Sequence, residues 1–285
     1  MKTIAVLGPG AVGGALAVPL SLAGARVICV ARPHTAAAIV HEGLTLDRCG
    51  EELQAHPEVT YELEDEVDLL LVTVKAPALE EALQRIAAQC ETVLPLMNGL
   101  EHVATLRARF GERVVVGSIG RLEAFRESPA HIVQTTPRPL LTMTTPVDVF
   151  DDAWFDVRIV EDERRVLWDK LARVAPLAAA TAATQQPVGE LRADPEWRAR
   201  LESAVEEVCA VASAEGLVLD PAAEWAIIDA MPATLTTSTA RDVAAGHPSE
   251  LDAITGAVVR AGQRVGVQTQ ALEQLLEEAC RVPSR

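Results

Sequence analysis

The sequence predicts an α/β protein, in which an N-terminal domain with a doubly wound, mostly parallel sheet is followed by an all-α C-terminal domain. Three observations support this fold class. The chain opens with a short apolar run that leads through a glycine-rich turn into a helical pattern. Short apolar runs then alternate with helical segments through about 120 residues. Beyond about residue 160 helical periodicity dominates, which places the domain boundary between residues 162 and 163.

The first 14 residues contain the most informative motif. Residues 4–7 form an apolar run of strand length, Gly8-x-Gly10-x-x-Gly13 follows directly, and a helical pattern begins at Ala15. Between a strand and a helix, the first glycine makes a tight turn, the second lets the backbone approach a pyrophosphate, and the third lets the helix pack on the strand. An isolated match would often be a plain turn, but this context predicts a Rossmann-type dinucleotide site. The candidate cofactor-binding residues are Gly8, Pro9, Gly10, Ala11, Val12 and Gly13.

The end of the second predicted strand, residues 26–30, bears on the choice of nucleotide. NAD-specific folds usually place an acidic residue there to bind the ribose 2′-hydroxyl, and this chain has Ala31 and Arg32 instead. A planar guanidinium suits a 2′-phosphate. Although Arg32 could be an ordinary solvated arginine, its position favours NADP(H), so residues 1–162 are interpreted as an NADP-binding domain.

Two further candidates follow predicted strands. Lys75 follows the strand at 67–74 and Asn98 follows the strand at 92–96. Because ligands of such sheets bind beyond the carboxyl ends of the strands, both are candidate site residues, although Asn98-Gly99 is also an ordinary turn signal. The remaining segments predicted before residue 163 are a strand or loop at 44–47, a helix at 78–88, and strands at 114–116, 131–133, 140–143 and 157–160. The predicted helices that follow lie at 166–183, at 197–215 with a cap at Gly216, from Asp220-Pro221, from Ser249 as cap, and at 265–280.

Composition excludes several classes of function. The 285 residues are 49% hydrophobic and carry a net charge of −16, which argues against nucleic acid or an anionic membrane as partner. Five scattered cysteines predict neither a metal site nor a disulfide framework, and they fit a reducing cytoplasm. We expect no signal peptide, no membrane segment and a small-molecule substrate. The alanine-rich helices are compatible with packing within one subunit or across a homodimer.

The order of these motifs resembles the ketopantoate reductase (2-dehydropantoate 2-reductase) family from Lys2 to about Gln270. The resemblance is carried by the glycine motif, the strand-end arginine, Val-Lys75-Ala, Asn98-Gly99, Trp-Asp-Lys170-Leu, and Ser238 followed by Ser-Glu250-Leu-Asp. It implies a helical substrate and catalytic domain at 163–285, an active site in the cleft between the domains, and NADPH as hydride donor to the ketone of a 2-oxo acid.

The resemblance also implies roles for individual residues. Lys170 matches the catalytic lysine that gives a proton to the developing alkoxide and also contacts substrate. Asn98 matches a residue at the junction of nicotinamide and substrate, and Ser238 one that holds the substrate. Glu250 matches a residue that closes onto the cofactor. Lys75 and Ala124 match cofactor contacts.

The chain departs from the family pattern where substrate is bound. Three family asparagines are replaced by Val174, Ala178 and Val188, and each lost hydrogen bond is worth roughly 0.5–1.5 kcal/mol. Compensation could come from Thr181, Thr184, Gln185 or Gln186. Three hypotheses remain open: a ketopantoate reductase of pantothenate biosynthesis, a family member that reduces a different, more apolar ketone or imine, and a non-catalytic NADP(H)-binding sensor.

Overall fold

The computed structural model describes residues 1–150 and 152–282, so the last three residues of the predicted C-terminal domain lie outside it. The chain divides into two compact units. The first comprises Met1–Met97 and His102–Val166, and the second comprises Asn98–Glu101 and Leu167–Arg285. The predicted boundary at 162/163 stays a prediction. The short segment Asn98–Glu101 packs with the second unit.

The first unit is built on a five-stranded parallel sheet with the order β5-β2-β1-β6-β7. Its strands are β1 (Thr3–Leu7), β2 (Arg26–Val30), β5 (Glu58–Thr60), β6 (Val67–Val72) and β7 (Cys90–Pro95). The chain builds outward from β1 through β2 to β5, and then returns to the other side of β1 with β6. This arrangement is the predicted doubly wound sheet, and its strand order reverses between β1 and β6, where such folds bind ligands.

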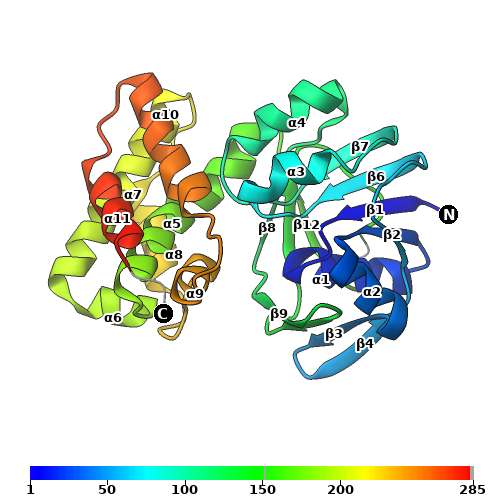
Figure 1. Ribbon diagram of the computed structural model, residues 1–285. Helices are drawn as coiled ribbons and strands as arrows, with labels where there is room; N and C mark the ends of the chain where they lie inside the picture. The colour runs from blue at the N-terminus through cyan, green and yellow to red at the C-terminus, as the bar shows by residue number, and fades with distance from the viewer. Residues whose placement is uncertain (151, 283–285) are drawn as a thin grey trace. The chain divides into compact units, whose positions relative to one another are not determined.

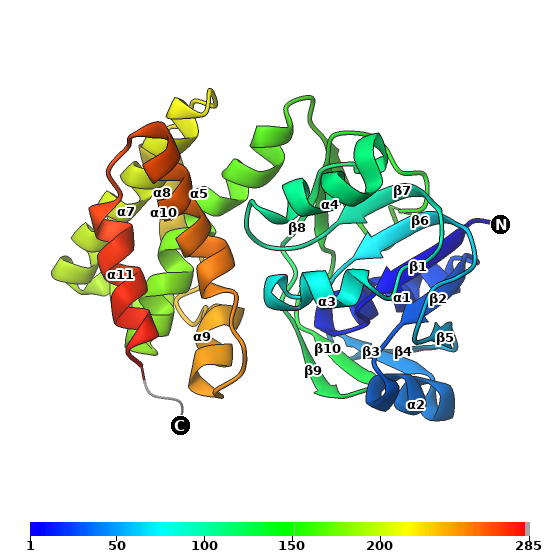
Figure 2. The same cartoon turned by 45° about the horizontal axis from the view of Figure 1, so that its top comes forward.

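Apolar clusters bury both faces of this sheet, and Figures 1 and 2 show the helices that pack beside it. Ile4 and Val6 of β1 belong to one apolar cluster, which includes residues of α1 (Ala11–Leu22). Ala5 and Leu7 belong to the opposite cluster, together with residues of α3 (Leu79–Leu83) and α4 (His102–Phe110). Because successive strand residues point to opposite faces, a continuous apolar run is the pattern expected of a strand covered on both sides. A further helix, α2 (Pro33–Glu42), contributes Ile39 to the first cluster.

Two smaller sheets complete the first unit. One has the order β4-β3-β10-β9 and the other β12-β11-β8. Their strands are β3 (Leu44–Arg48), β4 (Glu51–Ala55), β8 (Gly117–Gly120), β9 (Ala124–Ser128), β10 (His131–Gln134), β11 (Leu140–Met143) and β12 (Asp156–Ile159). Helix α1 packs against strands of both the main sheet and the four-stranded sheet, and the Cβ that Gly14 lacks would lie 2.4 Å from Ile132 of β10.

Two predictions for this unit were wrong in extent. The expected strand at 114–116 makes only an isolated bridge from Val114 to Val93, and regular pairing begins at Gly117. The expected helix at 78–88 is a 3₁₀ turn, η1 (Ala76–Ala78), followed by α3, which ends at Leu83. Ile86, within the predicted helix, instead bridges to Leu63.

The second unit is helical. Its elements are α5 (Glu163–Thr184, from Leu167 onward), α6 (Val188–Ala193), α7 (Pro195–Ala214), α8 (Pro221–Asp229), α9 (Ser238–Ala244), the π-helical turn η3 (Asp252–Gly256), α10 (Ala257–Val265) and α11 (Gln270–Cys280). The caps follow the sequence: Asp220 accepts a hydrogen bond from Ala222 N ahead of Pro221, and Gly216 has φ of +90° after α7.

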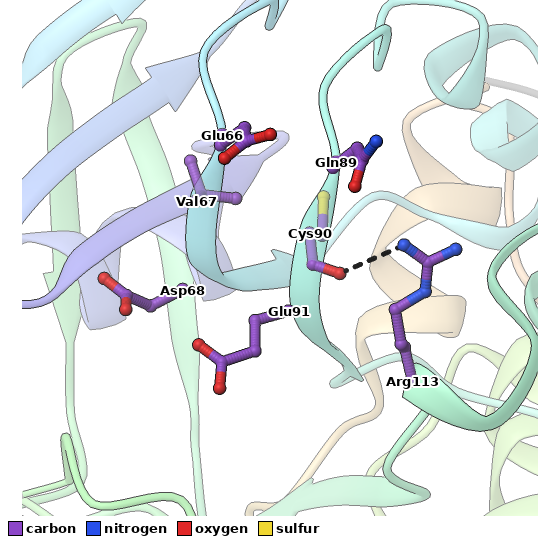
Figure 3. Close-up of a pocket in the computed structure, with 7 residues that line it drawn as sticks. All are labelled: Glu66, Val67, Asp68, Gln89, Cys90, Glu91 and Arg113. Atoms are coloured by element: carbon purple, nitrogen blue, oxygen red, sulfur yellow. Dashed lines mark hydrogen bonds between the residues drawn. The ribbon is translucent and has the colours of Figure 1, made fainter.

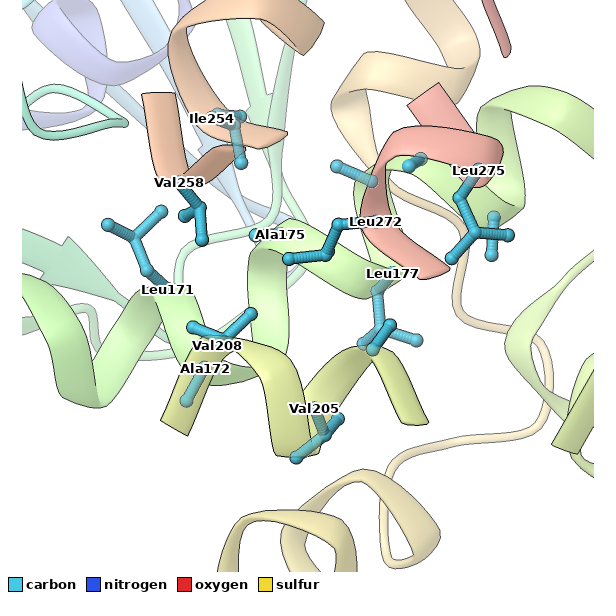
Figure 4. Close-up of a cluster of buried hydrophobic side chains, with 14 of the residues drawn as sticks. Leu171, Ala172, Ala175, Leu177, Val205, Val208, Ile254, Val258, Leu272 and Leu275 are labelled. Atoms are coloured by element: carbon cyan, nitrogen blue, oxygen red, sulfur yellow. The ribbon is translucent and has the colours of Figure 1, made fainter. Parts of the chain in front are cut away.

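The core of this unit lies where α5, α7, η3, α10 and α11 meet (Figure 4). Alanines on α5 such as Ala172 and Ala175 are fully buried, so neighbouring helices approach closely there, while Val208 and Leu272 fill the space between them. Two predicted helix starts were wrong. Helical residues begin at Leu251, two residues after the predicted cap Ser249, and α11 begins at Gln270 because Gly266 ends α10 in a left-handed conformation. Across residues 1–150 and 152–282, no helix is both long and apolar enough to cross a membrane.

Candidate functional site

The glycine motif forms the turn between β1 and α1. Gly8 has φ of +89°, its N–H donates to Val30 O at 3.1 Å, and an added Cβ would lie 2.5 Å from a methyl of Val74. Gly13 lies against the same turn, and a Cβ there would lie 2.3 Å from Gly8 O. The first and third glycines are therefore required by the packing of this turn.

The second glycine has a different environment. Apart from its own chain neighbours, no atom of the described chain lies within 4 Å of the Cβ that Gly10 lacks, so packing does not require glycine there. Gly10 precedes the first turn of α1, in which the N–H groups of Ala11, Val12 and Gly13 have no acceptor within the helix. Pro9 is buried between the two glycines. Open space over a row of backbone donors and a helix dipole fits the pyrophosphate of a dinucleotide.

Sequence reasoning missed one residue that shapes this turn. Thr73 follows β6, and its hydroxyl donates to Gly8 O at 2.9 Å, with Leu7 O at 3.1 Å. The same hydroxyl oxygen would lie 2.5 Å from a Cβ on Gly13. Thr73 thereby ties β6 to the glycine turn. The only sequence signal for it is a hydroxyl residue at the end of a buried strand.

The other predicted cofactor residues of the first unit lie on two sheets. Arg32 and Lys75 follow β2 and β6, so they lie at the same carboxyl edge as the glycine turn. Arg32 is exposed, and its side chain makes no hydrogen bond or ion pair within the described part of the chain. Lys75 is exposed at the start of η1. Ala124 is the first residue of β9 in the four-stranded sheet, and β9 packs against α1.

In the second unit, three predicted site residues from distant parts of the sequence are connected by hydrogen bonds. Lys170 on α5 donates from Nζ to Asn98 Oδ1 at 2.6 Å, and Asn98 donates from Nδ2 to Glu250 Oε2 at 2.8 Å. Glu250 is only 7% exposed. The amide of Asn98 thus lies between an amine and a buried carboxylate, with its oxygen toward the amine.

This environment changes the proton affinity of the lysine. Burial lowers the pKa of Lys170 from 10.5 to about 8, and the charge of Glu250 offsets part of that effect. The amine therefore titrates close to neutral pH. A group with this pKa can both hold and release a proton under ordinary conditions, which an exposed lysine cannot do efficiently.

The residues discussed for substrate binding have varied surroundings. Ser238 is exposed as the first residue of α9, whose cap is Thr237. Thr181 is fully buried on α5, and its hydroxyl lies 2.7 Å from the Thr237 hydroxyl. Thr184 and Gln185 hydrogen-bond to carbonyl groups within α5, and Gln186 N donates to Thr184 Oγ1 at 3.2 Å. Of the three apolar replacements, Ala178 and Val188 are fully buried in the core, and Val174 is half-buried beside it.

A pocket of about 510 Å³ in the first unit lies at the opposite edge of the sheet (Figure 3). It is lined by the amino ends of β6 and β7 and by Arg113, whereas the glycine turn, Arg32 and Lys75 follow strand carboxyl ends. Glu66, Asp68 and Glu91 give it an acidic lining. An acidic pocket does not suit an anionic nucleotide, so this pocket is separate from the candidate cofactor site.

The chain is similar to known proteins over nearly its whole length. The profile "Ketopantoate reductase PanE/ApbA" matches residues 4–143, and "Ketopantoate reductase PanE/ApbA C terminal" matches residues 162–280. The 2-dehydropantoate 2-reductase of Vibrio cholerae is 30% identical, with 96% of each chain covered. That of Caulobacter vibrioides is also 30% identical, with 95% of this chain and 96% of the relative covered.

Solved structures agree with the fold. The crystal structure of 2-dehydropantoate 2-reductase from Geobacter metallireducens GS-15 superposes with a TM-score of 0.88 at 27% identity, covering 99% of this chain and all of the other. The two profile matches fall on the α/β part and on the helical part of the chain, in the order seen here. The chain therefore belongs to the ketopantoate reductase family of oxidoreductases.

Proposed function

We propose that the protein is an NADPH-dependent reductase that transfers a hydride to the carbonyl carbon of a 2-oxo acid, with Lys170 as the proton donor. The observation that carries the proposal is the half-buried Lys170 amine, which lies 2.6 Å from Asn98 Oδ1 and has a pKa of about 8. On this proposal Lys170 is the catalytic residue, Asn98 holds its amine, Glu250 holds the Asn98 amide, and both Asn98 and Glu250 contact the reactants.

The first unit would hold the nucleotide. The N–H groups at the start of α1 would bind the pyrophosphate above Gly10, and Arg32 would pair with the 2′-phosphate. Lys75 and Ala124 remain proposed cofactor contacts. When bound, the nicotinamide supplies the hydride, and the chain supplies binding, orientation and a proton.

Lys170 would supply that proton to the substrate. As hydride reaches the carbonyl carbon, negative charge develops on its oxygen, and a nearby ammonium both stabilises this charge and transfers a proton to it. Because the pKa of Lys170 is about 8, the ammonium form predominates at pH 7 and is depleted as the pH rises through 8. Ser238 is proposed to hold the substrate.

The substrate itself has two candidates. Family membership favours 2-dehydropantoate, whose reduction gives pantoate. Val174, Ala178 and Val188 favour a second candidate, a more apolar ketone or imine, because none of these side chains can form the hydrogen bond to substrate that an asparagine would form. A third hypothesis is a non-catalytic NADP(H) sensor. The hydrogen-bonded arrangement of Lys170, Asn98 and Glu250 counts against it.

Oxidation of NADPH, followed by its absorbance, separates these readings. We expect turnover with ketopantoate or with another member of a panel of 2-oxo acids, ketones and imines. Lys170→Ala should lower turnover by about 10²–10⁴ and leave NADPH affinity nearly unchanged. The matched control Lys2→Ala removes an exposed lysine just before β1 and should retain full activity.

The outcomes decide between the three readings. Efficient oxidation with ketopantoate would exclude the apolar-substrate reading, and tight NADPH binding without turnover of any compound would support the sensor. Full activity of Lys170→Ala would contradict the role proposed for this residue.

A further inference from the structure

The segment Asn98–Glu101 packs on the chain that follows Glu250. Asn98 reaches Glu250 through a 2.8 Å hydrogen bond. Gly99 has φ of +91°, and a Cβ on it would lie 2.1 Å from Ala253 O in η3. Leu100 packs against the core of the second unit. The segment therefore contacts η3 so closely that only glycine fits at position 99.

An arginine of α10 bridges the two sides of this contact. Arg260 donates to both carboxylate oxygens of Glu101, from Nε at 2.9 Å and from Nη2 at 2.8 Å. It also donates from Nη1 to Asp252 Oδ1 at 2.7 Å. The Arg260 guanidinium lowers the pKa of Glu101, so this carboxylate stays charged at neutral pH. Arg260 thus links Glu101, three residues after Asn98, to Asp252, two residues after Glu250.

The π-helical turn is in turn fixed to the helix that carries Lys170. Thr255 of η3 is fully buried, and its hydroxyl donates to Ala175 O on α5 at 2.8 Å. Ala175 follows Lys170 on the same helix. Asn98, Glu250 and Lys170 are therefore held by one connected set of contacts, to which Arg260 contributes the only described side chain that bridges Glu101 and Asp252.

An isolated ion pair at a protein surface contributes little, and Arg260 is 37% exposed. The geometry here differs from that case. The guanidinium is bidentate to one carboxylate and also engages a second, and both partners belong to chain segments that carry site residues. We therefore expect Arg260 to affect mainly the positions of these two segments, and to contribute little to the global stability of the protein.

We propose that Arg260 is a positioning residue, which bridges Glu101 and Asp252 and thereby holds Asn98 Oδ1 against Lys170 Nζ. The proposal rests on the proposed function only in that it explains how the proton donor is held. Without the bridge, the segment Asn98–Glu101 loses its hydrogen bonds to α10 and keeps there only the 4.0 Å ion pair between Glu101 and Arg264, so the acceptor of the amine is less firmly held.

The test measures the titration of Lys170 without any substrate. Reaction of the amine with acetic anhydride across a pH series, quantified by mass spectrometry, gives the acid dissociation constant of Lys170. The variants are Arg260→Gln, Asn98→Ala and the double variant, with Glu101→Gln to break the same bridge from its other end. Arg200→Gln is the matched control, because Arg200 joins α7 to α11 through Glu278 at 2.8 Å.

We expect Arg260→Gln to raise the acid dissociation constant of Lys170 about tenfold, as for loss of one hydrogen bond to a charged group. Asn98→Ala should do the same, the double variant should show no further change, and Arg200→Gln should match the wild type. With substrate, turnover should fall about tenfold in Arg260→Gln at unchanged NADPH affinity.

Wild-type titration of Lys170 in both Arg260→Gln and Glu101→Gln would overturn the proposal, as would additive effects of Arg260→Gln and Asn98→Ala. If the titrations behave as expected but no compound is reduced by the wild type, the positioning role stands and the proposed reductase function fails.

Discussion

At the scale of single residues, the choice between NADPH and NADH depends on Arg32. Its guanidinium is exposed at the carboxyl end of β2, and no acidic residue accompanies it there. Arg26, at the other end of the same strand, is held by Glu58 through two hydrogen bonds at 2.8 and 2.7 Å. The guanidinium of Arg26 is therefore already paired with a carboxylate, whereas that of Arg32 has no such partner in the described part of the chain and can bind a ligand.

Arg32→Ala should weaken NADPH binding by roughly 10–100-fold, because a hydrogen-bonded charge pair with the 2′-phosphate is lost. NADH lacks this phosphate, so its affinity should change much less. Fluorescence titration with both nucleotides measures the difference, and Arg26→Ala, at the opposite edge of the sheet, is the control. Equal losses for the two nucleotides would mean that Arg32 does not select NADPH.

At the scale of elements, the turn between β1 and α1 separates glycines needed by the fold from one available to a ligand. Gly13 lies against Gly8 O, a backbone atom that could shift only at a cost in conformational energy. Gly10 has open space and a negative φ of −83° that alanine can adopt. The same substitution at these two positions therefore tests folding and binding separately.

Gly13→Ala should destabilise the first unit by about 1–3 kcal/mol, as overpacking does. Gly10→Ala should change its stability by less than about 1 kcal/mol and still weaken NADPH binding, because the added methyl occupies the space where the pyrophosphate would lie. Chemical denaturation and nucleotide titration of both variants provide the measurements. Normal NADPH affinity in Gly10→Ala would place the nucleotide elsewhere.

At the scale of the whole molecule, the sequence predicts what local patterns determine and misses what distant contacts determine. The apolar runs at β1, β2, β6 and β7 identify the parallel sheet because each is buried on both faces. The short strands β4 and β5 are mostly polar, with exposed residues, and leave no such pattern.

Asn98, Lys170 and Glu250 were candidates from the sequence, but the hydrogen bonds that connect them were not predictable. The contact between Gly99 and Ala253 joins residues more than 150 positions apart. Nothing in the composition around position 260 distinguishes Arg260 from a solvated surface arginine.

The lowered pKa of Lys170 also has a consequence for the stability of the second unit. The pKa of Lys170 is about 8 in the folded chain and 10.5 when exposed. Below pH 8 both states bind the proton, and the folded state bears the full cost of the buried charge. Between pH 8 and 10.5 the unfolded state binds more protons, so stability rises with pH, and above 10.5 the contribution is constant. This shift corresponds to about 3 kcal/mol.

Relative to Lys170→Met, the wild type should therefore gain about 3 kcal/mol of unfolding free energy between pH 7 and 10.5. Urea denaturation followed by tryptophan fluorescence measures this, because Trp168, Trp197 and Trp225 all lie in the second unit. The Lys2→Met variant, altered in the first unit, controls for the general effect of alkaline pH. A pH-independent difference between wild type and Lys170→Met would mean that the amine is hydrated in the folded protein. Its capacity to donate a proton near neutral pH would then need a cause other than burial.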